Sequence, residues 1–362
     1  MTDVHEFVIF SDHHAHNHKY GAVRRELVRE QSTVHNSRLL DSVAVINEIA
    51  EYVKNNHIDT TIFAGDLFHT RGNVPTDVYN LTYEAVRAIP SEVIMIPGNH
   101  DYADREGKIH SLEPFKDVTT VHDTPFTEAR FARNIEPAYF HFVPYSDVKN
   151  KVVQDIANLK TVPGHVNILI GHAGIQGAKV GSDYVLVNDS DLEITDIDLT
   201  RFTACFFGHF HKHQMLARNA WYVGASHQHN WGDAGCRRGF LHVTIRDGKT
   251  LIKQIESSAP KFVNISSLEE FDIHSNNFVR LHMDVPTEAK LEQYTKKLGY
   301  PQKIEVISPA EEGVADEDNV FDLDINTLIP SHLVSYWNTL HGRDDSLAKL
   351  GLEILAEAEV KS

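Results

Sequence analysis

Five short apolar runs in this chain end in the same way, with metal-binding types of side chain following directly. The five segments, between Phe10 and His211, are FSDHHAH, FAGDLFH, IPGNHD, LIGHAG and FFGHFH. Apolar runs of this length, bounded by glycine and polar residues, are typical of buried β-strands. Ligands of an open sheet bind outside the carboxyl ends of its strands, so segments far apart in the chain can meet there. The pattern therefore predicts an α/β fold with a metal site at one edge of its sheet.

The first 260 residues combine strand patterns with helical ones. Apolar runs at 7–10, 60–64 and 93–96 predict strands, and helical spacing of apolar residues over 39–53 and 78–88 predicts helices between them. This alternation indicates an open sheet with helices packed on it. Later apolar runs follow one another more closely and predict a second, more antiparallel sheet. They lie at 139–143, 166–170, 204–207, 221–223 and 240–245. We therefore expect a layered α/β sandwich of two sheets flanked by helices.

The pattern changes after residue 260. Strand-like runs at 278–285 and 303–307 flank a helical stretch at 288–298, which predicts a small β-α-β unit. An acidic stretch at 311–318 is typical of a solvated linker. Beyond Pro330, Ser331 can cap the first of two amphipathic helices, which carries Trp337 and Leu340 on its apolar side. We predict a main domain over 1–260, a small α+β domain over 261–312, and a linker with a helical tail over 313–362.

Composition limits the chemistry and the partners. The sequence lacks the 18 or so consecutive apolar residues of a membrane span, and MTDVHEF lacks the layout of a signal peptide, so we expect a cytoplasmic protein without a membrane partner.

The two cysteines form no CxxC pair, which leaves the 24 histidines and the carboxylates as metal ligands. A net charge of −17 argues against a passive nucleic-acid binder. Because residues 261–362 hold 19 Asp/Glu and 9 Lys/Arg, this acidity does not exclude a DNA substrate for the first 260 residues.

The candidate ligands have spacings that suit two ions. Asp12 and His14 are two residues apart, as are His209 and His211, and alternate residues of a strand point the same way. A carboxylate such as Asp66 could bridge two ions. Nitrogen-rich sets favour Mn, Fe or Zn over Mg or Ca. The simplest interpretation of the neighbouring histidines is as loop or core residues beside the site; they are at positions 13, 16, 18, 213, 227 and 229.

The order Asp-x-His, GD, GNHD, GH and GHxH resembles the calcineurin-like metallophosphoesterase superfamily. The resemblance implies two divalent ions, with Mn²⁺ the leading candidate. One ion would be held by Asp12, His14, Asp66 and His211, and the other by Asp66, Asn99, His172 and His209. It further implies that His100 is the general acid or transition-state stabiliser and that Asp101 supports it.

The stretch GDLFHTRGNVP is similar to the SbcD nucleases, the nuclease partners of an SMC-like coiled-coil ATPase in DNA double-strand-break processing. This resemblance implies that His69 acts near the scissile phosphate. Arg24, Arg25 and Arg71 could contact the DNA backbone, although such charges by themselves are more typical of a solvated helix face. The resemblance also implies a nuclease domain at 1–260, a capping domain at 261–312, an SbcC-like ATPase bound to the C-terminal helices, and a homodimer. Those helices could instead pack on their own domain.

Two other functions use the same residues. A stand-alone phosphodiesterase or phosphatase acting on a small molecule or phosphoprotein would need the ligands but neither His69 nor the C-terminal third. A non-catalytic scaffold on the same fold would need none of them, and the presence of every ligand together with His100 argues against it.

Overall fold

A computed structural model of the chain describes residues 4–27, 33–104, 107–130, 136–180, 184–185, 191–267, 273–284 and 286–308. The acidic linker at 311–318 and the helical tail with Trp337 and Leu340 lie outside the described residues. No helix in the described part of the chain combines the length and apolarity that crossing a bilayer requires.

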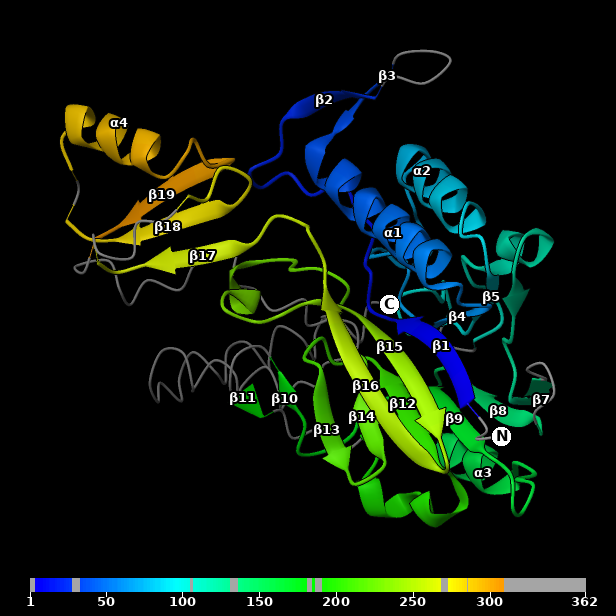
Figure 1. Ribbon diagram of the computed structural model, residues 1–362. Helices are drawn as coiled ribbons and strands as arrows, with labels where there is room; N and C mark the ends of the chain where they lie inside the picture. Colours follow the sequence, from blue (N-terminus) through cyan, green and yellow to red (C-terminus); the bar gives the residue numbers. More distant parts are fainter. Residues whose placement is uncertain are drawn as a thin grey trace, which may run out of the picture.

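Two six-stranded sheets stack face to face in the main body (Figure 1). The first sheet has the order β16-β15-β1-β4-β5-β6. Its strands are β1 (Val4–Phe10), β4 (Thr60–Phe63), β5 (Glu92–Met95), β6 (Thr120–Val121), β15 (Gly239–Arg246) and β16 (Lys249–Glu256). Pairing is parallel from β1 through β6 and antiparallel from β1 through β16.

The helices α1 (Ser37–Asn56) and α2 (Thr76–Arg87) cover the outer face of this sheet (Figure 1). The side chain of Asn36 accepts a hydrogen bond from the backbone N–H of Arg38 at 2.8 Å and thereby caps the start of α1. The helix ends at Asn56, and His57 caps it with a left-handed backbone of φ 55°. The positions of α1 and α2 match the helices predicted over 39–53 and 78–88.

The second sheet has the order β13-β14-β12-β9-β8-β7. Its strands are β7 (Phe126–Arg130), β8 (Ala138–Val143), β9 (Asn167–His172), β12 (Ala204–Gly208), β13 (Gln214–Ala217) and β14 (Ala220–Tyr222). The helix α3 (Lys149–Asn158) connects β8 to β9. The four central strands of this sheet are parallel to one another. The edge pairs β13·β14 and β7·β8 are antiparallel. The expectation of a more antiparallel second sheet was therefore wrong.

The run at 240–245 is also placed differently from the expectation. It forms β15, which pairs with β1 in the first sheet and not with the second sheet. Short spacing between apolar runs shows that strands lie close along the chain, but it does not determine which sheet a strand joins. The layered α/β sandwich itself is confirmed.

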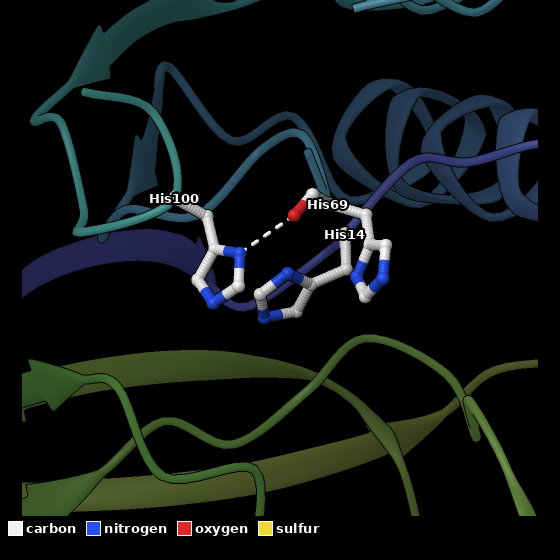
Figure 2. Close-up of side chains that lie close together, drawn as sticks. All are labelled: His14, His69 and His100. Carbon is white, nitrogen blue, oxygen red and sulfur yellow. Dashed lines mark hydrogen bonds between the residues drawn. The ribbon is translucent and has the colours of Figure 1, made fainter. Parts of the chain in front are cut away.

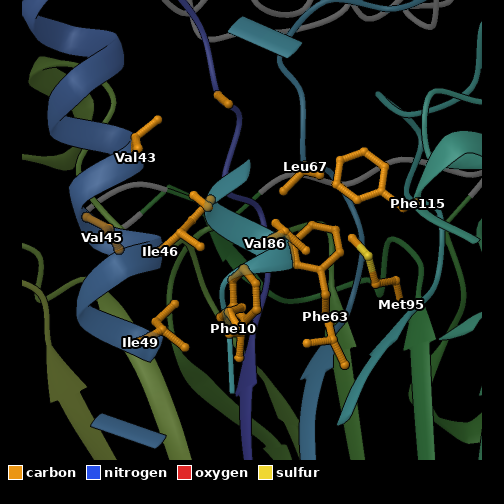
Figure 3. Close-up of a cluster of buried hydrophobic side chains, with 14 of the residues drawn as sticks. Phe10, Val43, Val45, Ile46, Ile49, Phe63, Leu67, Val86, Met95 and Phe115 are labelled. Atoms are coloured by element: carbon orange, nitrogen blue, oxygen red, sulfur yellow. The ribbon is translucent and has the colours of Figure 1, made fainter. Parts of the chain in front are cut away.

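Strand alternation divides the core into layers. Val8 and Phe10 of β1 face α1 and α2, in a cluster that includes Ile46 and Phe63 (Figure 3). Phe7 and Ile9 face the other way and pack between the two sheets. A third cluster covers the outer face of the second sheet, where α3 lies. Burial on both faces explains why the central strands read as continuous apolar runs.

A small unit follows the sandwich. The strands β17 (Phe262–Ile265), β18 (Phe278–His282) and β19 (Lys303–Ile307) form a parallel sheet with α4 (Glu288–Lys297) beside it. The β-α-β unit expected from the sequence is thus present, with β17 as an additional strand. Separately, β2 (Arg24–Leu27) and β3 (Thr33–Asn36) form an antiparallel pair, as do the short strands β10 (Lys179–Val180) and β11 (Tyr184–Val185). Single 3-10 turns lie at Glu113–Asp117, Ile194–Asp196, Leu199–Arg201 and Trp231–Asp233.

Candidate metal centre

The predicted ligands converge at the carboxyl ends of five parallel strands. Asp12 follows β1, Asp66 follows β4, and Asn99 follows β5 in the first sheet. In the second sheet His172 ends β9 and His209 follows β12. Parallel strands that end at one edge explain how segments from the whole main body can form a single site.

One group of ligand atoms surrounds the side chain of Asn99. The Asn99 oxygen lies 3.0 Å from His172 Nε2 and 2.9 Å from His209 Nδ1. Oδ2 of Asp66 lies 3.4 Å from His172 Nε2. This is the set of four residues predicted for one of the two ions.

A second group lies beside it. His14 Nε2 and His211 Nε2 are 3.2 Å apart. Asp12, His14 and His211 each offer an atom to a cluster within 4.8 Å, and Asp12 forms another such cluster with Asp66 and His172. The same Asp66 Oδ2 is 3.7 Å from His14 Nε2. Asp66 therefore lies between the two groups, in the place of a bridging carboxylate.

Backbone strain is concentrated at these residues. The described part of the chain has seven non-glycine residues with positive φ, and four of them are predicted ligands. They are Asp12 at 49°, His14 at 48°, Asp66 at 64° and His209 at 111°. Such conformations cost about 1–3 kcal/mol each and persist where the surrounding structure enforces them, which happens mostly at functional sites.

Two glycines allow the loops to approach one another. A Cβ on Gly98 would lie 2.2 Å from Asp66 Oδ1 and 2.6 Å from His172 Cε1. A Cβ on Gly65, whose φ is +97°, would lie 2.3 Å from His172 Nδ1. Any side chain at either position would displace a predicted ligand, so the glycines that begin the GD and GNHD motifs have a structural reason.

The electrostatics of the centre favour a cation. Burial would raise the pKa of Asp66, but His172 and His100 outweigh it and hold that pKa well below its usual range. Burial lowers the pKa of His172, yet the Asp66 carboxylate raises it to about 9. Burial takes the pKa of His209 down to about 3, which leaves its imidazole neutral and able to act as a ligand.

The residues fit two divalent cations. Oδ2 of Asp12 is buried and has no hydrogen-bond partner among the described residues, a costly state for a carboxylate oxygen unless a cation satisfies it. The Asn99 amide can be oriented in two ways, and only the one with its oxygen toward His172 and His209 presents a ligand to a cation. Carboxylate, amide oxygen and neutral imidazole form a donor set for Mn, Fe or Zn.

His100 and His69 lie together beside His14 (Figure 2). Nδ1 of His100 donates to the backbone carbonyl of His69 at 2.6 Å. The His100 ring is 4.7 Å from the His14 ring, and the His69 ring is 5.8 Å from it, measured between centroids. His100 is therefore held by one ring nitrogen, which leaves Nε2 for a substrate.

Asp101 has a different place from the one its predicted role suggests. Its carboxylate accepts hydrogen bonds from the backbone N–H groups of Asp66 at 2.8 Å, Leu67 at 3.0 Å and Gly98 at 2.9 Å. Burial, together with the charge of Asp66, raises the pKa of Asp101 to about 7. The ring of His100 is held by the His69 carbonyl, so Asp101 supports the loops and not the ring.

The three predicted DNA-contacting arginines do not form one group. Nη2 of Arg71 lies 3.1 Å from the Asn99 amide, at the metal centre. Arg24 and Arg25 lie on the β2–β3 hairpin, where Arg25 Nη1 forms an ion pair with Asp41 at 2.8 Å and Arg24 is exposed.

The sequence predicts His229 as a loop residue near the site and gives it no role. Its Nε2 lies 3.1 Å from the backbone carbonyl of Asp12, and its ring is 5.3 Å from His14 and 5.0 Å from His211. The ring of Tyr145 stacks on His209 at 6.2 Å and was not predicted. No sequence motif marks Tyr145, because its loop meets the centre only in the folded chain.

The fold and the site define a metal-dependent phosphoesterase with clusters that can bind two ions. The chain belongs to the calcineurin-like phosphoesterase family, whose family model matches residues 5–213.

Three solved structures are among those to which the chain is similar. TT1561 of Thermus thermophilus is 12% identical with a TM-score of 0.39, over 70% of this chain and 99% of that one. Purple acid phosphatase PPD1 from yellow lupin seeds is 14% identical with a TM-score of 0.43, over 71% of this chain and 52% of that one. NAD nucleotidase of Haemophilus influenzae is 12% identical with a TM-score of 0.41, over 84% and 57%. At these values the similarities carry no information about the substrate.

Proposed function

We propose that this phosphoesterase is a Mn²⁺-dependent DNA nuclease, an exonuclease that could also act as an endonuclease. In this proposal it is the nuclease subunit of an SbcCD-like DNA repair or recombination complex. The observation that carries the proposal is the position of His69. A minimal phosphatase does not need this histidine, and here it stands beside both the metal centre and His100.

The geometry around His69 supports a role at the scissile phosphate. Its ring is 5.9 Å from the His100 ring and nearly parallel to it, at 20°. His14, His69 and His100 each offer a nitrogen to a cluster within 4.8 Å (Figure 2). Two imidazoles next to a metal ligand can donate hydrogen bonds to phosphoryl oxygens, and these bonds strengthen where negative charge develops.

In the proposed reaction, the ions, His100 and Arg71 have separate roles. The two divalent ions, when bound, supply the Lewis acidity that lowers the pKa of water and neutralises charge on the phosphoryl oxygens. His100, oriented by the His69 carbonyl, protonates or stabilises the leaving oxygen from Nε2. Arg71 is placed to hold a non-bridging phosphate oxygen. In DNA the leaving group would be a 3′-oxygen, and the product a 5′-mononucleotide.

Recognition of the rest of the DNA is proposed for the β2–β3 hairpin. Arg24 is exposed there and available to a backbone phosphate, whereas Arg25 would have to share its charge with Asp41. The proposed SbcC-like ATPase partner would bind the C-terminal helices and the protein would be a homodimer. Support for these two points comes from the sequence alone, because residues 309–362 are outside the described part of the chain.

A substrate panel tests the proposal. The purified chain with Mn²⁺ is assayed on linear duplex DNA, single-stranded DNA, a cyclic nucleotide and a chromogenic phosphomonoester, with and without chelator. We expect chelator-sensitive hydrolysis of DNA. Turnover of the small esters alone would contradict the nuclease function and favour a stand-alone phosphodiesterase or phosphatase.

The variant His69→Ala sharpens this test. DNA hydrolysis should fall by about 10²-fold or more, the size of a general acid–base or oxyanion contribution. Turnover of a small ester with a good leaving group should fall much less. His165→Ala is the matched control, because His165 lies in a surface loop before β9 and contacts none of the ligands.

A further inference from the structure

A pocket of about 370 Å³ opens beside the segment that follows the last metal ligands. It lies between the residues after His211, the loop that precedes β15, and strand β16. The lining residues are Lys212, His213, Ala234, Gly235, Cys236, Arg237, Arg238 and Gln254. None of them is a predicted metal ligand, so the pocket is a separate site.

The pocket is lined by cationic side chains. Lys212, Arg237 and Arg238 line it, and there is no Asp or Glu among its lining residues. The Arg237 side chain is 65% exposed, and its Nε forms an ion pair with Glu256 at 3.3 Å that leaves its two terminal nitrogens for another partner. The whole chain has a net charge of −17, so this cationic lining is opposite in sign to the charge of the protein.

Arg238 supplies the second, independent observation. The residue is 3% exposed, and one of its terminal nitrogens, Nη2, pairs with Asp233. Its Nε and Nη1 are buried and have no hydrogen-bond partner among the described residues. A buried guanidinium with two unsatisfied donors is costly, and the residue that carries them lines this pocket.

We propose that this pocket binds a phosphate group at a site distinct from the metal centre. Cations from three residues around one cavity suit a tetrahedral anion, which presents oxygens in several directions, and arginine forks match phosphate geometry. The pocket itself carries this proposal. Assigning the phosphate to a second position along a nucleic-acid strand rests on the proposed nuclease function, and a free phosphate or phosphomonoester is the other source.

Cys236 provides a reporter within the pocket. It is partly exposed, whereas Cys205, the other cysteine of the chain, is fully buried. An alkylating reagent such as iodoacetamide should therefore modify Cys236 in the folded protein. A phosphate bound in the pocket would shield this thiol and slow its alkylation.

The experiment measures the alkylation rate of the full chain while inorganic phosphate replaces chloride at constant ionic strength. It is run with Mn²⁺ and again with chelator. We expect saturable protection that is the same in both conditions. No protection, or protection that requires the metal, would overturn the proposal, because the phosphate would then be absent or bound at the metal centre.

Two variants of cationic residues that line the pocket test whether phosphate protects Cys236 by binding there. Lys212→Ala and Arg237→Ala should each raise the phosphate concentration for half protection by roughly tenfold, since each removes a charge-assisted contact. Arg246→Ala, at the far end of β15, is the matched control and should leave protection unchanged. Equal protection in all four proteins would overturn the assignment to this pocket.

A short single-stranded oligonucleotide, used with chelator to prevent its hydrolysis, separates the two sources. The oligonucleotide concentration is counted in phosphate groups. If the oligonucleotide protects Cys236 at a concentration at least tenfold lower than inorganic phosphate does, a strand is the ligand. Equal or weaker protection identifies a free phosphate. Absence of DNA hydrolysis in the substrate panel would remove the nuclease function and leave the inorganic-phosphate result standing.

Discussion

The carboxylate of Asp101 accepts a hydrogen bond at 2.8 Å from the backbone N–H of Asp66, the residue placed to bridge the two ions. A residue that offers nothing to the ions thus holds the loop that presents the bridging ligand. The same carboxylate also accepts from Gly98, next to Asn99, so two ligand loops are tied to one side chain. Supporting contacts of this kind orient ligands and tune the metal site.

Replacing Asp101 with Asn should loosen both loops. An amide nitrogen cannot accept from a backbone N–H, so at least one of the buried donors loses its partner. We expect the free energy of unfolding to fall by about 1–3 kcal/mol and Mn²⁺ affinity to fall with it. Calorimetry of unfolding and of metal binding measures both. Asp117→Asn, an exposed change on the surface, is the control, and equal stability of the two variants would contradict the role of Asp101.

Replacing His100 with Ala should separate metal binding from turnover. His100 lies beside the ligands but is not one of them, so elemental analysis should find the metal content of the unaltered protein. Hydrolysis should fall by about 10²–10⁴-fold, the usual contribution of a positioned acid or base. Full turnover in this variant would remove His100 from the mechanism.

Replacing Gly98 with Ala should damage the metal centre directly. The added Cβ would meet the backbone nitrogen of Asp66 at 2.5 Å, and this contact cannot be relieved by a flexible side chain. We expect a large loss of metal affinity together with about 1–3 kcal/mol of destabilisation, as for overpacking a core. Gly232→Ala is the control, because its Cβ meets only the side-chain oxygen of Asn230, at 3.0 Å. Normal metal binding by the Gly98 variant would show that the loops can move apart.

Removing the metal should destabilise the folded chain. A ligand at a hundred times its Kd adds about 2.7 kcal/mol, and two ions in a buried acidic centre should add several. Chelator should therefore lower the Tm of the unaltered protein. Asp66→Asn should reduce this difference more than Asn99→Ala, since Asp66 belongs to both groups of ligands. A Tm independent of chelator would argue against a bound divalent ion.

The buried pair of Asp233 and Arg238 should make the free energy of unfolding depend on pH in the acidic range. Burial raises the pKa of the Asp233 carboxyl, but Arg238 outweighs it and holds the pKa below its usual range. Because the folded pKa is the lower one, the stabilisation is complete above the unfolded pKa of about 3.9 and is lost as pH falls through the folded pKa.

Asp233→Asn tests this pair. The variant should lose about 3–5 kcal/mol of unfolding free energy at neutral pH, as when one partner of a buried ion pair is removed. The difference from the unaltered protein should shrink as the pH falls below about 4. Urea unfolding at several pH values measures it. Asp247→Asn, in the exposed turn between β15 and β16, is the control, and a difference that grows in acid would contradict the assignment.

Much of the fold followed from local sequence. Strands such as β1 and β4 are apolar on both faces, and α1 has apolar residues at helical spacing, so their type and position could be predicted from neighbours in the chain. The pattern of an apolar strand followed by Asp, Asn or His also identified the residues that meet at the metal centre. Those patterns are local because each strand must be buried and each ligand loop must begin where its strand ends.

Other features depend on contacts between distant segments. The sequence of β15 is as apolar as that of β9, and only pairing with β1 places it in the first sheet. The attachment of Asp101 to the Asp66 loop, the stacking of Tyr145 on His209, and the unsatisfied donors of Arg238 have no counterpart in spacing or composition. The sequence by itself determined the alternation of strand and ligand, because periodicity and strand ends are local. Tertiary structure decided which loops meet and at what distance, because those contacts are set by packing of the whole chain.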